Sequence, residues 1–225
     1  MKTFRKTTAR LSEKVTRVRR SIAPVQARLG VECLEERTLL SVSALVDSAG
    51  LLEVTATAAD QIKITCSKSK VKINGSHPST GAVLCAQISE IQVTGGSGGN
   101  LIDLKGVTTA KFDANIKVWV LAGNGQDTVY GSQFDDALIG GFGSDTIRGG
   151  DGDDVIYGDE PNSTVGANDV IFGDAGDDYI AAYANVDFTL SNGTLQGLGT
   201  DQFQGIERAI LVGGPSGNRI DASAF

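Results

Sequence analysis

The chain of 225 residues is poor in several residue types on which metal enzymes and disulfide-rich proteins depend. It has one histidine, one tryptophan, three cysteines and four prolines, and aromatic residues make up 6% of it. A single histidine, His77, excludes zinc sites of the HExxH type and histidine-rich metal centres. No stretch approaches the roughly 18 consecutive apolar residues of a membrane-spanning helix. The sequence therefore predicts no membrane span and no histidine-based catalysis.

The three cysteines are too few for a disulfide scaffold, but they leave room for one internal pair. Cys66 and Cys85 are separated by about one turn of a solenoid, which is compatible with a disulfide and equally with two buried thiols. Cys33 would remain unpaired in either case.

Charge is distributed unevenly along the chain. Residues 1–40 contain ten Lys or Arg and four Asp or Glu, whereas residues 41–225 have a net charge of −13. A basic, aromatic-poor leader could bind nucleic acid or anionic lipid, but its position at the N-terminus favours a targeting segment. We therefore predict a basic targeting leader over residues 1–43, partly helical or disordered, and no nucleic-acid partner.

Glycine is abundant, with 29 residues, and much of it recurs with a nine-residue period. The segments 140–148 and 149–157 both follow the pattern GGxGxDxUx, where U is a large aliphatic residue. The same frame extends over segments 122–130, 131–139, 158–172 and 173–181, and segment 158–172 contains a six-residue insertion. A disordered Gly/Asp-rich linker would have no reason to keep an aliphatic residue two places after an aspartate through six units.

The period predicts two rows of aspartates. Two nonapeptides make one turn of a parallel roll, so residues 18 apart stack at a spacing of about 4.8 Å. The first aspartate ladder then comprises Asp127, Asp145 and Asp169, and the second comprises Asp136, Asp154 and Asp178. Adjacent charges at that spacing repel by about 0.9 kcal/mol even in water. A cation between them is required, and Ca²⁺ suits a site of flexible geometry made of oxygen ligands.

The turn glycines complete the predicted metal site. Their carbonyls would lie beside the aspartates, and the tight turns need backbone conformations that a Cβ would obstruct. These glycines are Gly123, Gly125, Gly141, Gly143, Gly150, Gly152 and Gly176. The aliphatic residue at the eighth position should point into a narrow core; these residues are Val129, Leu138, Ile147, Ile156, Ile171 and Ile180.

The repeats over residues 122–181 resemble the RTX, or hemolysin-type calcium-binding, family. The resemblance implies a right-handed parallel β-roll, sixth-position aspartates that share calcium ions, and a secreted or cell-surface protein. Two flanking segments, 95–102 and 213–220, keep the glycine turn but carry asparagine where the aspartate belongs, so we expect them to hold their shape without metal. The family includes toxins, proteases, lipases and adhesins, so the repeat alone does not specify an activity.

A second resemblance lies within the leader. The segment Leu34–Ser41, LEERTLLS, is similar to the LEPR-XLL motif of large exported planctomycete proteins, with Glu36 in place of the usual proline. The resemblance implies export by an unspecified route.

The remaining segments are expected to extend the roll. Residues 44–121 alternate as strands do and predict an irregular β-helix or capping segment that covers the open edge. Residues 182–225 predict a less regular continuation of the solenoid that stops without a visible cap, as a fragment would. The fold class expected is thus all-β, a parallel β-roll or β-helix.

The sequence supports a catalytic function less well than it supports calcium binding. Residues 95–99 match GxSxG, but a nucleophile elbow needs a strand-to-helix turn. The pairs Asp153–Asp154 and Asp177–Asp178 could serve a glycosidase or lyase, although one member of each is assigned to calcium. We therefore expect a non-enzymatic, exported, calcium-folded module with a structural or adhesive role and a protein or polysaccharide partner. The alternatives are the secretion module of a larger RTX enzyme or toxin, and a β-helix polysaccharide lyase using Lys63, Lys72 or Arg148.

Overall fold

The computed structural model describes residues 42–225, so the predicted leader and the Leu34–Ser41 segment lie outside the described residues, apart from the last two residues of the leader. The described body consists of strands joined by turns and one short 3-10 helix, η1 (Cys85–Gln87). No helix in this part of the chain is long and apolar enough to cross a membrane. The predicted all-β class is confirmed.

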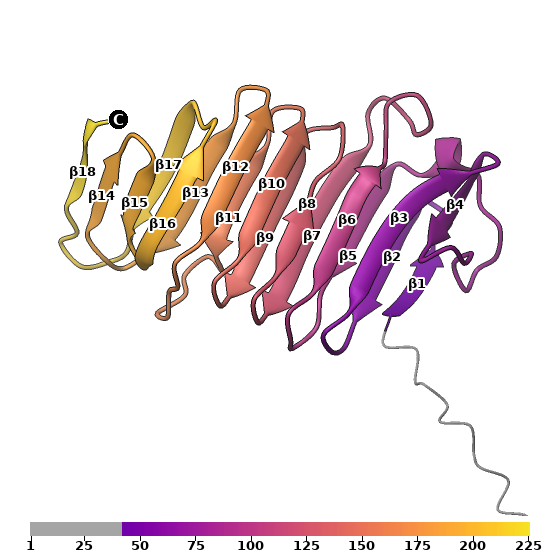
Figure 1. Cartoon of the computed structure of the whole chain (residues 1–225), viewed down its shortest axis with the longest axis horizontal. Helices are drawn as coiled ribbons and strands as arrows, with labels where there is room; N and C mark the ends of the chain where they lie inside the picture. The colour runs from indigo at the N-terminus through magenta and orange to yellow at the C-terminus, as the bar shows by residue number, and fades with distance from the viewer. Residues whose placement is uncertain (1–41) are drawn as a thin grey trace, which may run out of the picture. The chain divides into compact units, whose positions relative to one another are not determined.

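Two long sheets face each other along the body and enclose one continuous core (Figure 1). The eight-stranded sheet contains, in spatial order, β1 (Val42–Val46), β2 (Leu51–Ala56), β5 (Glu90–Thr94), β7 (Lys117–Asn124), β9 (Asp136–Phe142), β11 (Val155–Asp159), β13 (Tyr179–Ala184) and β17 (Arg208–Gly213). The ten-stranded sheet contains β18 (Ile220–Ala224), β14 (Phe188–Ser191), β15 (Thr194–Gly197), β16 (Gly199–Gln204), β12 (Val170–Ala175), β10 (Thr146–Asp151), β8 (Thr128–Tyr130), β6 (Leu101–Gly106), β3 (Gln61–Ser67) and β4 (Lys70–Ile73).

The chain alternates between the two sheets through the central repeats, and every pairing there is parallel. Ile147 in β10 pairs with Val129 in β8 and with Ile171 in β12. The opposite sheet shows the same register, in which Ile156 pairs with Leu138 and Ile180. The eighth position of each repeat therefore forms an aliphatic column in each sheet, and all six predicted residues are fully buried. This confirms the predicted frame, including the step across the insertion.

The N-terminal segment begins the roll with antiparallel edges. Strand β2 pairs with β5, and β3 pairs with β6, in parallel, whereas β1 and β4 pair antiparallel with β2 and β3. Cys66 in β3 and Cys85 in η1 form a disulfide, which settles the pairing that the sequence left open. A capping segment was expected here, and β1 starts at Val42, two residues before the predicted boundary.

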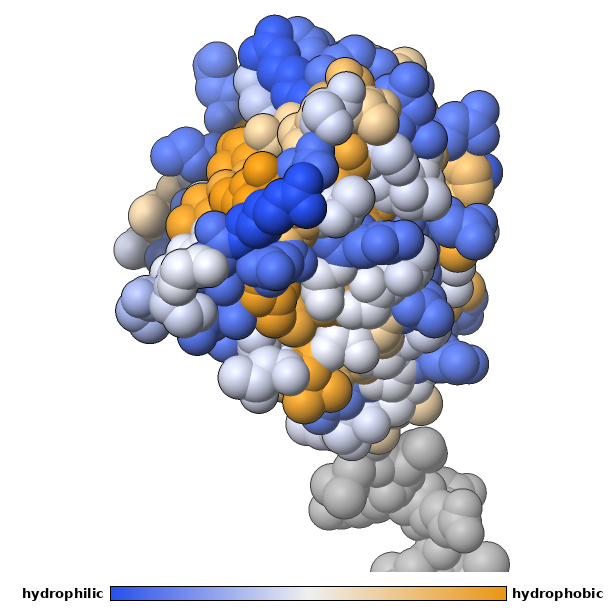
Figure 2. Space-filling view, turned by 90° about the vertical axis from the view of Figure 1, so that its left-hand side faces the viewer, coloured by the Kyte–Doolittle hydropathy of each residue, from blue (hydrophilic) through white to orange (hydrophobic). Residues whose placement is uncertain are grey.

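The C-terminal segment differs from the expected solenoid continuation in one respect. Strands β16 and β17 resume parallel pairing with β12 and β13, but β14, β15 and β16 form an antiparallel meander. The turns responsible contain Gly193 and Gly199, whose φ angles of 91° and 86° suit tight reversals of the chain. At this end of the body, apolar side chains gather among hydrophilic ones (Figure 2), and Val212, Ile220 and Phe225 are exposed there.

Candidate calcium-binding repeats

The turns between the two sheets depend on glycine. All seven predicted turn glycines have φ angles between 108° and 150°, a region that side chains with a Cβ rarely adopt. A Cβ added at Gly143 would lie 2.0 Å from the carbonyl oxygen of Gly125, one turn of the roll away. The stacked turns therefore touch through their backbones, as the sequence predicts.

The first aspartate ladder is held by hydrogen bonds that run from one turn to the next. The backbone N–H of Asp127 donates to Oδ1 of Asp145 at 2.8 Å, and the N–H of Asp145 donates to Oδ1 of Asp169 at 2.8 Å. The ladder continues at both ends, because Asn100 donates to Asp127 Oδ1 and Asp169 donates to Asp201 Oδ1. Each carboxylate thus uses one oxygen to fix the turn before it.

The second aspartate ladder repeats this arrangement on the opposite edge of the roll. The N–H of Asp136 donates to Asp154 Oδ1 at 2.8 Å, and the N–H of Asp154 donates to Asp178 Oδ1 at 2.9 Å. The N–H of Asp178 in turn donates to Oε2 of Glu207 at 2.9 Å. The structure therefore brings together all six predicted aspartates in two rows, and each is almost completely buried.

The second oxygen of most ladder carboxylates accepts no hydrogen bond. These buried Oδ2 atoms belong to Asp127, Asp145, Asp154, Asp169 and Asp178. A Cβ added at Gly140 would lie 2.4 Å from Asp145 Oδ2 and 2.5 Å from the carbonyl oxygen of Gly158. Glycine thus keeps a space open in which a carboxylate oxygen that has no donor lies beside a carbonyl oxygen, which is also an acceptor.

Asn100 shows what satisfies that space when no carboxylate is present. It is buried at the sixth position of the segment 95–102, and its Nδ2 donates to the carbonyl oxygens of Gly98 and Ala122 at 2.7 and 3.0 Å. The same Nδ2 also lies 3.1 Å from Asp127 Oδ1. The amide supplies the donors that the aspartates lack, which agrees with the expectation that this turn holds its shape without metal.

Asp136 differs from the other five ladder aspartates. The backbone N–H of Ser132 donates to its Oδ2 at 2.6 Å, and the Ser132 hydroxyl donates to its Oδ1 at 2.7 Å. Ser132 stands where the regular repeat has its second glycine, and the change from glycine to serine adds a hydroxyl donor to the carboxylate. Asp136 was predicted as a metal ligand on its position alone; its side chain is already satisfied by the protein.

Burial raises the pKa of the ladder carboxyls, because the low-dielectric interior disfavours their charged form. The pKa of Asp145 rises to about 8 and that of Asp154 to about 9, with neighbouring carboxylates adding to the effect of burial. The pKa of Asp136 rises to about 7, although the hydrogen bonds from Ser132 oppose the shift. Without a cation, these side chains are costly to ionise at neutral pH.

The donor set fits calcium. Hard divalent cations take carboxylate and carbonyl oxygens, and Ca²⁺ accepts six to eight of them in flexible geometry. Each unpartnered Oδ2 is buried and negatively charged when ionised, and those of Asp145, Asp154 and Asp178 lie beside a backbone carbonyl. Asp127, Asp145, Asp154, Asp169 and Asp178, with the turn carbonyls, are the residues that would hold the ion, which would supply the positive charge that neutralises the ladders.

Sequence reasoning missed three acidic residues beside the ladders. Asp201 and Glu207 extend the two rows beyond the last nonapeptide, and Asp159 lies next to Asp169 and Asp201 at the second position of its unit. The sequence pattern that could have identified Asp201 and Glu207 is an acidic residue followed two positions later by an apolar one, as in Asp201–Phe203 and Glu207–Ala209. It went unused because the meander between these residues and the repeats breaks the nine-residue spacing.

The residues considered for catalysis occupy structural positions. Residues 95–99 form a turn between β5 and β6, so the GxSxG match has no strand-to-helix elbow. Lys63 Nζ lies 2.8 Å from Asp103 Oδ2, and Arg148 Nη1 lies 2.6 Å from Asp174 Oδ1. His77 is exposed in a loop.

Comparison with known proteins agrees with this geometry. Residues 119–138, 130–165 and 164–188 match the family described as the RTX calcium-binding nonapeptide repeat (4 copies). The centre of the chain therefore carries repeats of the RTX, or hemolysin, type within a β-roll. No curated protein and no solved structure matches the chain.

Proposed function

We propose that this chain is an exported, non-enzymatic module that binds calcium along its two aspartate ladders and completes its folding when calcium is present. The observation that carries the proposal is the set of five buried Oδ2 atoms without a hydrogen-bond donor. A buried acceptor without a partner costs about 1–3 kcal/mol, and more when it is charged. Their ordered repetition favours a bound cation over accidental defects.

The folding role follows from where the acids lie. The ladders join successive turns of the roll, so a cation between them stabilises the folded stack and has no equivalent site in an extended chain. A ligand that binds only the folded state adds stability by mass action, about 2.7 kcal/mol per site at a hundred times its dissociation constant. Extracellular calcium modules bind at about 10⁻⁴ to 10⁻³ M, which would couple folding to export.

A structural or adhesive role at the cell surface is the activity that we propose for the folded module. Two of the cations that a lyase on this fold would use, Lys63 and Arg148, are engaged with neighbouring carboxylates. The two long sheets offer contact surface for a protein or polysaccharide partner, and the module itself performs no chemistry.

The test is a calcium titration of the full chain followed by far-UV circular dichroism, with magnesium as the control ion. We expect a cooperative gain of β signal in calcium alone. A spectrum in chelator that already has the full β content and does not change with calcium would refute the folding role. Calorimetry that also showed no calcium binding would refute the proposed sites.

A further inference from the structure

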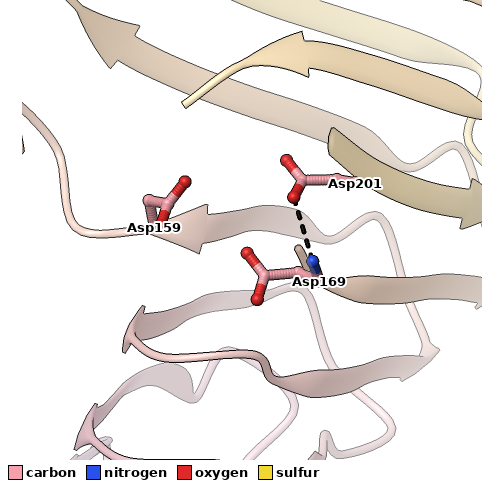
Figure 3. A group of neighbouring side chains, drawn as sticks. All are labelled: Asp159, Asp169 and Asp201. Atoms are coloured by element: carbon pink, nitrogen blue, oxygen red, sulfur yellow. Dashed lines mark hydrogen bonds between the residues drawn. The ribbon is translucent and has the colours of Figure 1, made fainter. Parts of the chain in front are cut away.

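Three carboxylates converge at the C-terminal end of the first aspartate ladder, outside the regular repeat pattern (Figure 3). Asp159 is the last residue of β11, Asp169 directly precedes β12, and Asp201 lies in β16. One oxygen from each lies within 4.8 Å of the other two. The end of β11, the start of β12 and strand β16 thus bring their three carboxylates together.

Each carboxylate is held in place by a backbone donor. Asp159 Oδ1 accepts the N–H of Ala167 at 3.1 Å, Asp169 Oδ1 accepts that of Asp145 at 2.8 Å, and Asp201 Oδ1 accepts that of Asp169 at 3.0 Å. These bonds fix the side chains and use only one oxygen of each. The loop of the insertion and the meander strand are therefore both anchored beside the cluster.

Two further observations point to a ligand. Asp169 is only 1% exposed, and its buried Oδ2 accepts no hydrogen bond. A small cavity of about 10 Å³ adjoins the cluster and is lined by Asp159, Asp201 and Tyr183 among others. That volume is about what a single water molecule or ion requires.

We propose that Asp159, Asp169 and Asp201 form a divalent-cation site of three carboxylates, which prefers calcium and binds it more tightly than the sites of the regular repeats. The units 140–148 and 149–157 have glycine at the second position, Gly141 and Gly150, where this unit has Asp159. Asp201 lies beyond the last nonapeptide. The site therefore goes beyond the proposed function of the repeats, and only Asp169 is shared with it.

The greater affinity follows from charge. A regular turn offers one carboxylate oxygen without a partner beside a carbonyl, whereas this cluster offers three carboxylates to one ion. The affinity of calcium sites rises with the number of charged ligands and with the rigidity of the site. Because β11 belongs to one sheet, and β12 and β16 to the other, a bound ion would tie the two sheets together and fasten the insertion loop between them.

The experiment uses Tb³⁺, an oxygen-seeking ion that can stand in for calcium, with the full chain. Tyr183 lines the same cavity and lies beside Tyr157, with 6.0 Å between ring centroids, so tyrosine excitation should sensitise an ion bound there. We expect a tight phase of Tb³⁺ emission that calcium displaces. Asp159→Asn and Asp201→Asn should each weaken that phase by about tenfold or more, because each removes one charged ligand.

Matched variants separate this inference from the proposed function. Asp159 forms no bond of the ladders, and an asparagine there can still accept from Ala167, so Asp159→Asn is expected to fold; circular dichroism in calcium checks this. Asp113→Asn, in an exposed turn, controls for loss of charge and should leave the tight phase unchanged. Asp154→Asn should remove weaker binding only.

If Asp159→Asn and Asp201→Asn leave the tight phase unchanged while Asp154→Asn removes binding, the three-carboxylate site is refuted and the repeat sites stand. If the first two variants abolish the tight phase and Asp154→Asn changes nothing, the three-carboxylate site stands and the repeat sites are refuted. The absence of any emission that calcium displaces would refute both.

Discussion

Replacing Asp154 with asparagine should stabilise the protein without calcium and remove the stabilisation that calcium gives at that position. Asp154 is fully buried, its Oδ1 accepts the N–H of Asp136, and its Oδ2 has no donor. Asparagine keeps the first bond through its amide oxygen. Its Nδ2 would take the place of Oδ2 near the carbonyl of Gly173, as the amide of Asn100 does beside Ala122.

The magnitude without calcium follows from the pKa of Asp154. A pKa raised from 3.8 to about 9 means that at pH 7 the folded state must take up a proton that the unfolded chain has lost. At about 1.4 kcal/mol per pH unit, this costs roughly 4 kcal/mol at pH 7. The asparagine variant avoids this cost, and an imperfect hydrogen bond for its amide would take back about 1–2 kcal/mol. We expect a net gain of about 2–3 kcal/mol in chelator.

With calcium this gain should be offset. The variant loses a charged ligand, and one lost site is worth about 2.7 kcal/mol at a calcium concentration a hundred times the dissociation constant. Chemical denaturation at pH 7, in chelator and in saturating calcium, measures both free energies of unfolding. Asp151→Asn removes an exposed charge from the same repeat and should change neither free energy by more than about 0.5 kcal/mol. Equal destabilisation of the Asp154 variant in both conditions would contradict the reasoning.

Three other outcomes are expected. In chelator the protein should lose stability as pH rises from about 4 towards 8, because the folded state binds more protons than the unfolded chain over that range. Asp145, with its pKa raised to about 8, is one source of this difference. Denaturation midpoints that rise with pH would contradict the prediction. Ser132→Gly should remove the hydroxyl donor to Asp136 Oδ1 while the backbone N–H remains. The change should increase the calcium stoichiometry measured by calorimetry and destabilise the chelated protein by about 1–3 kcal/mol; an unchanged stoichiometry would show that Asp136 does not bind calcium. Reduction of the Cys66–Cys85 disulfide should lower the free energy of unfolding by about 3 kcal/mol, the value expected for a loop of this length. Thermal unfolding with and without reductant measures this change. Equal midpoints would indicate that the core alone stabilises the N-terminal segment.

The nine-residue frame was readable from the sequence because each position of the repeat has one physical task. The turn glycines adopt positive φ, the side chains of the sixth-position aspartates bind the turn before them, and the eighth-position residues fill the core. Each task restricts the residue type. Even the six-residue insertion did not hide the frame, because Asp169 and Ile171 keep their relative spacing and resume the columns.

The rest of the site depends on contacts that no local pattern encodes. Asp159 and Asp201 meet only because an insertion and a meander of particular lengths return to the same edge of the roll. The satisfaction of Asp136 by Ser132 depends on a side-chain hydrogen bond at a position where glycine was expected. The hairpin of β14 and β15 was marked by turn residues, but its antiparallel pairing is decided by packing against β16 and β18.

The exceptions to the regular repeat indicate how calcium dependence would be distributed along the body. On the N-terminal side, the amide of Asn100 replaces the cation, Ser132 satisfies the first acid of the second ladder, and a disulfide fastens the cap over a fully buried core. We therefore expect the N-terminal segment to fold without metal and to offer strand edges with which the repeats can pair. Beyond that segment, five ladder acids have an oxygen without a donor, and each also accepts the backbone N–H of the turn before it; these acids are Asp127, Asp145, Asp154, Asp169 and Asp178. Under the proposed function, ions that bind along these turns would therefore extend an existing template, and order would spread from the cap towards the three-carboxylate cluster.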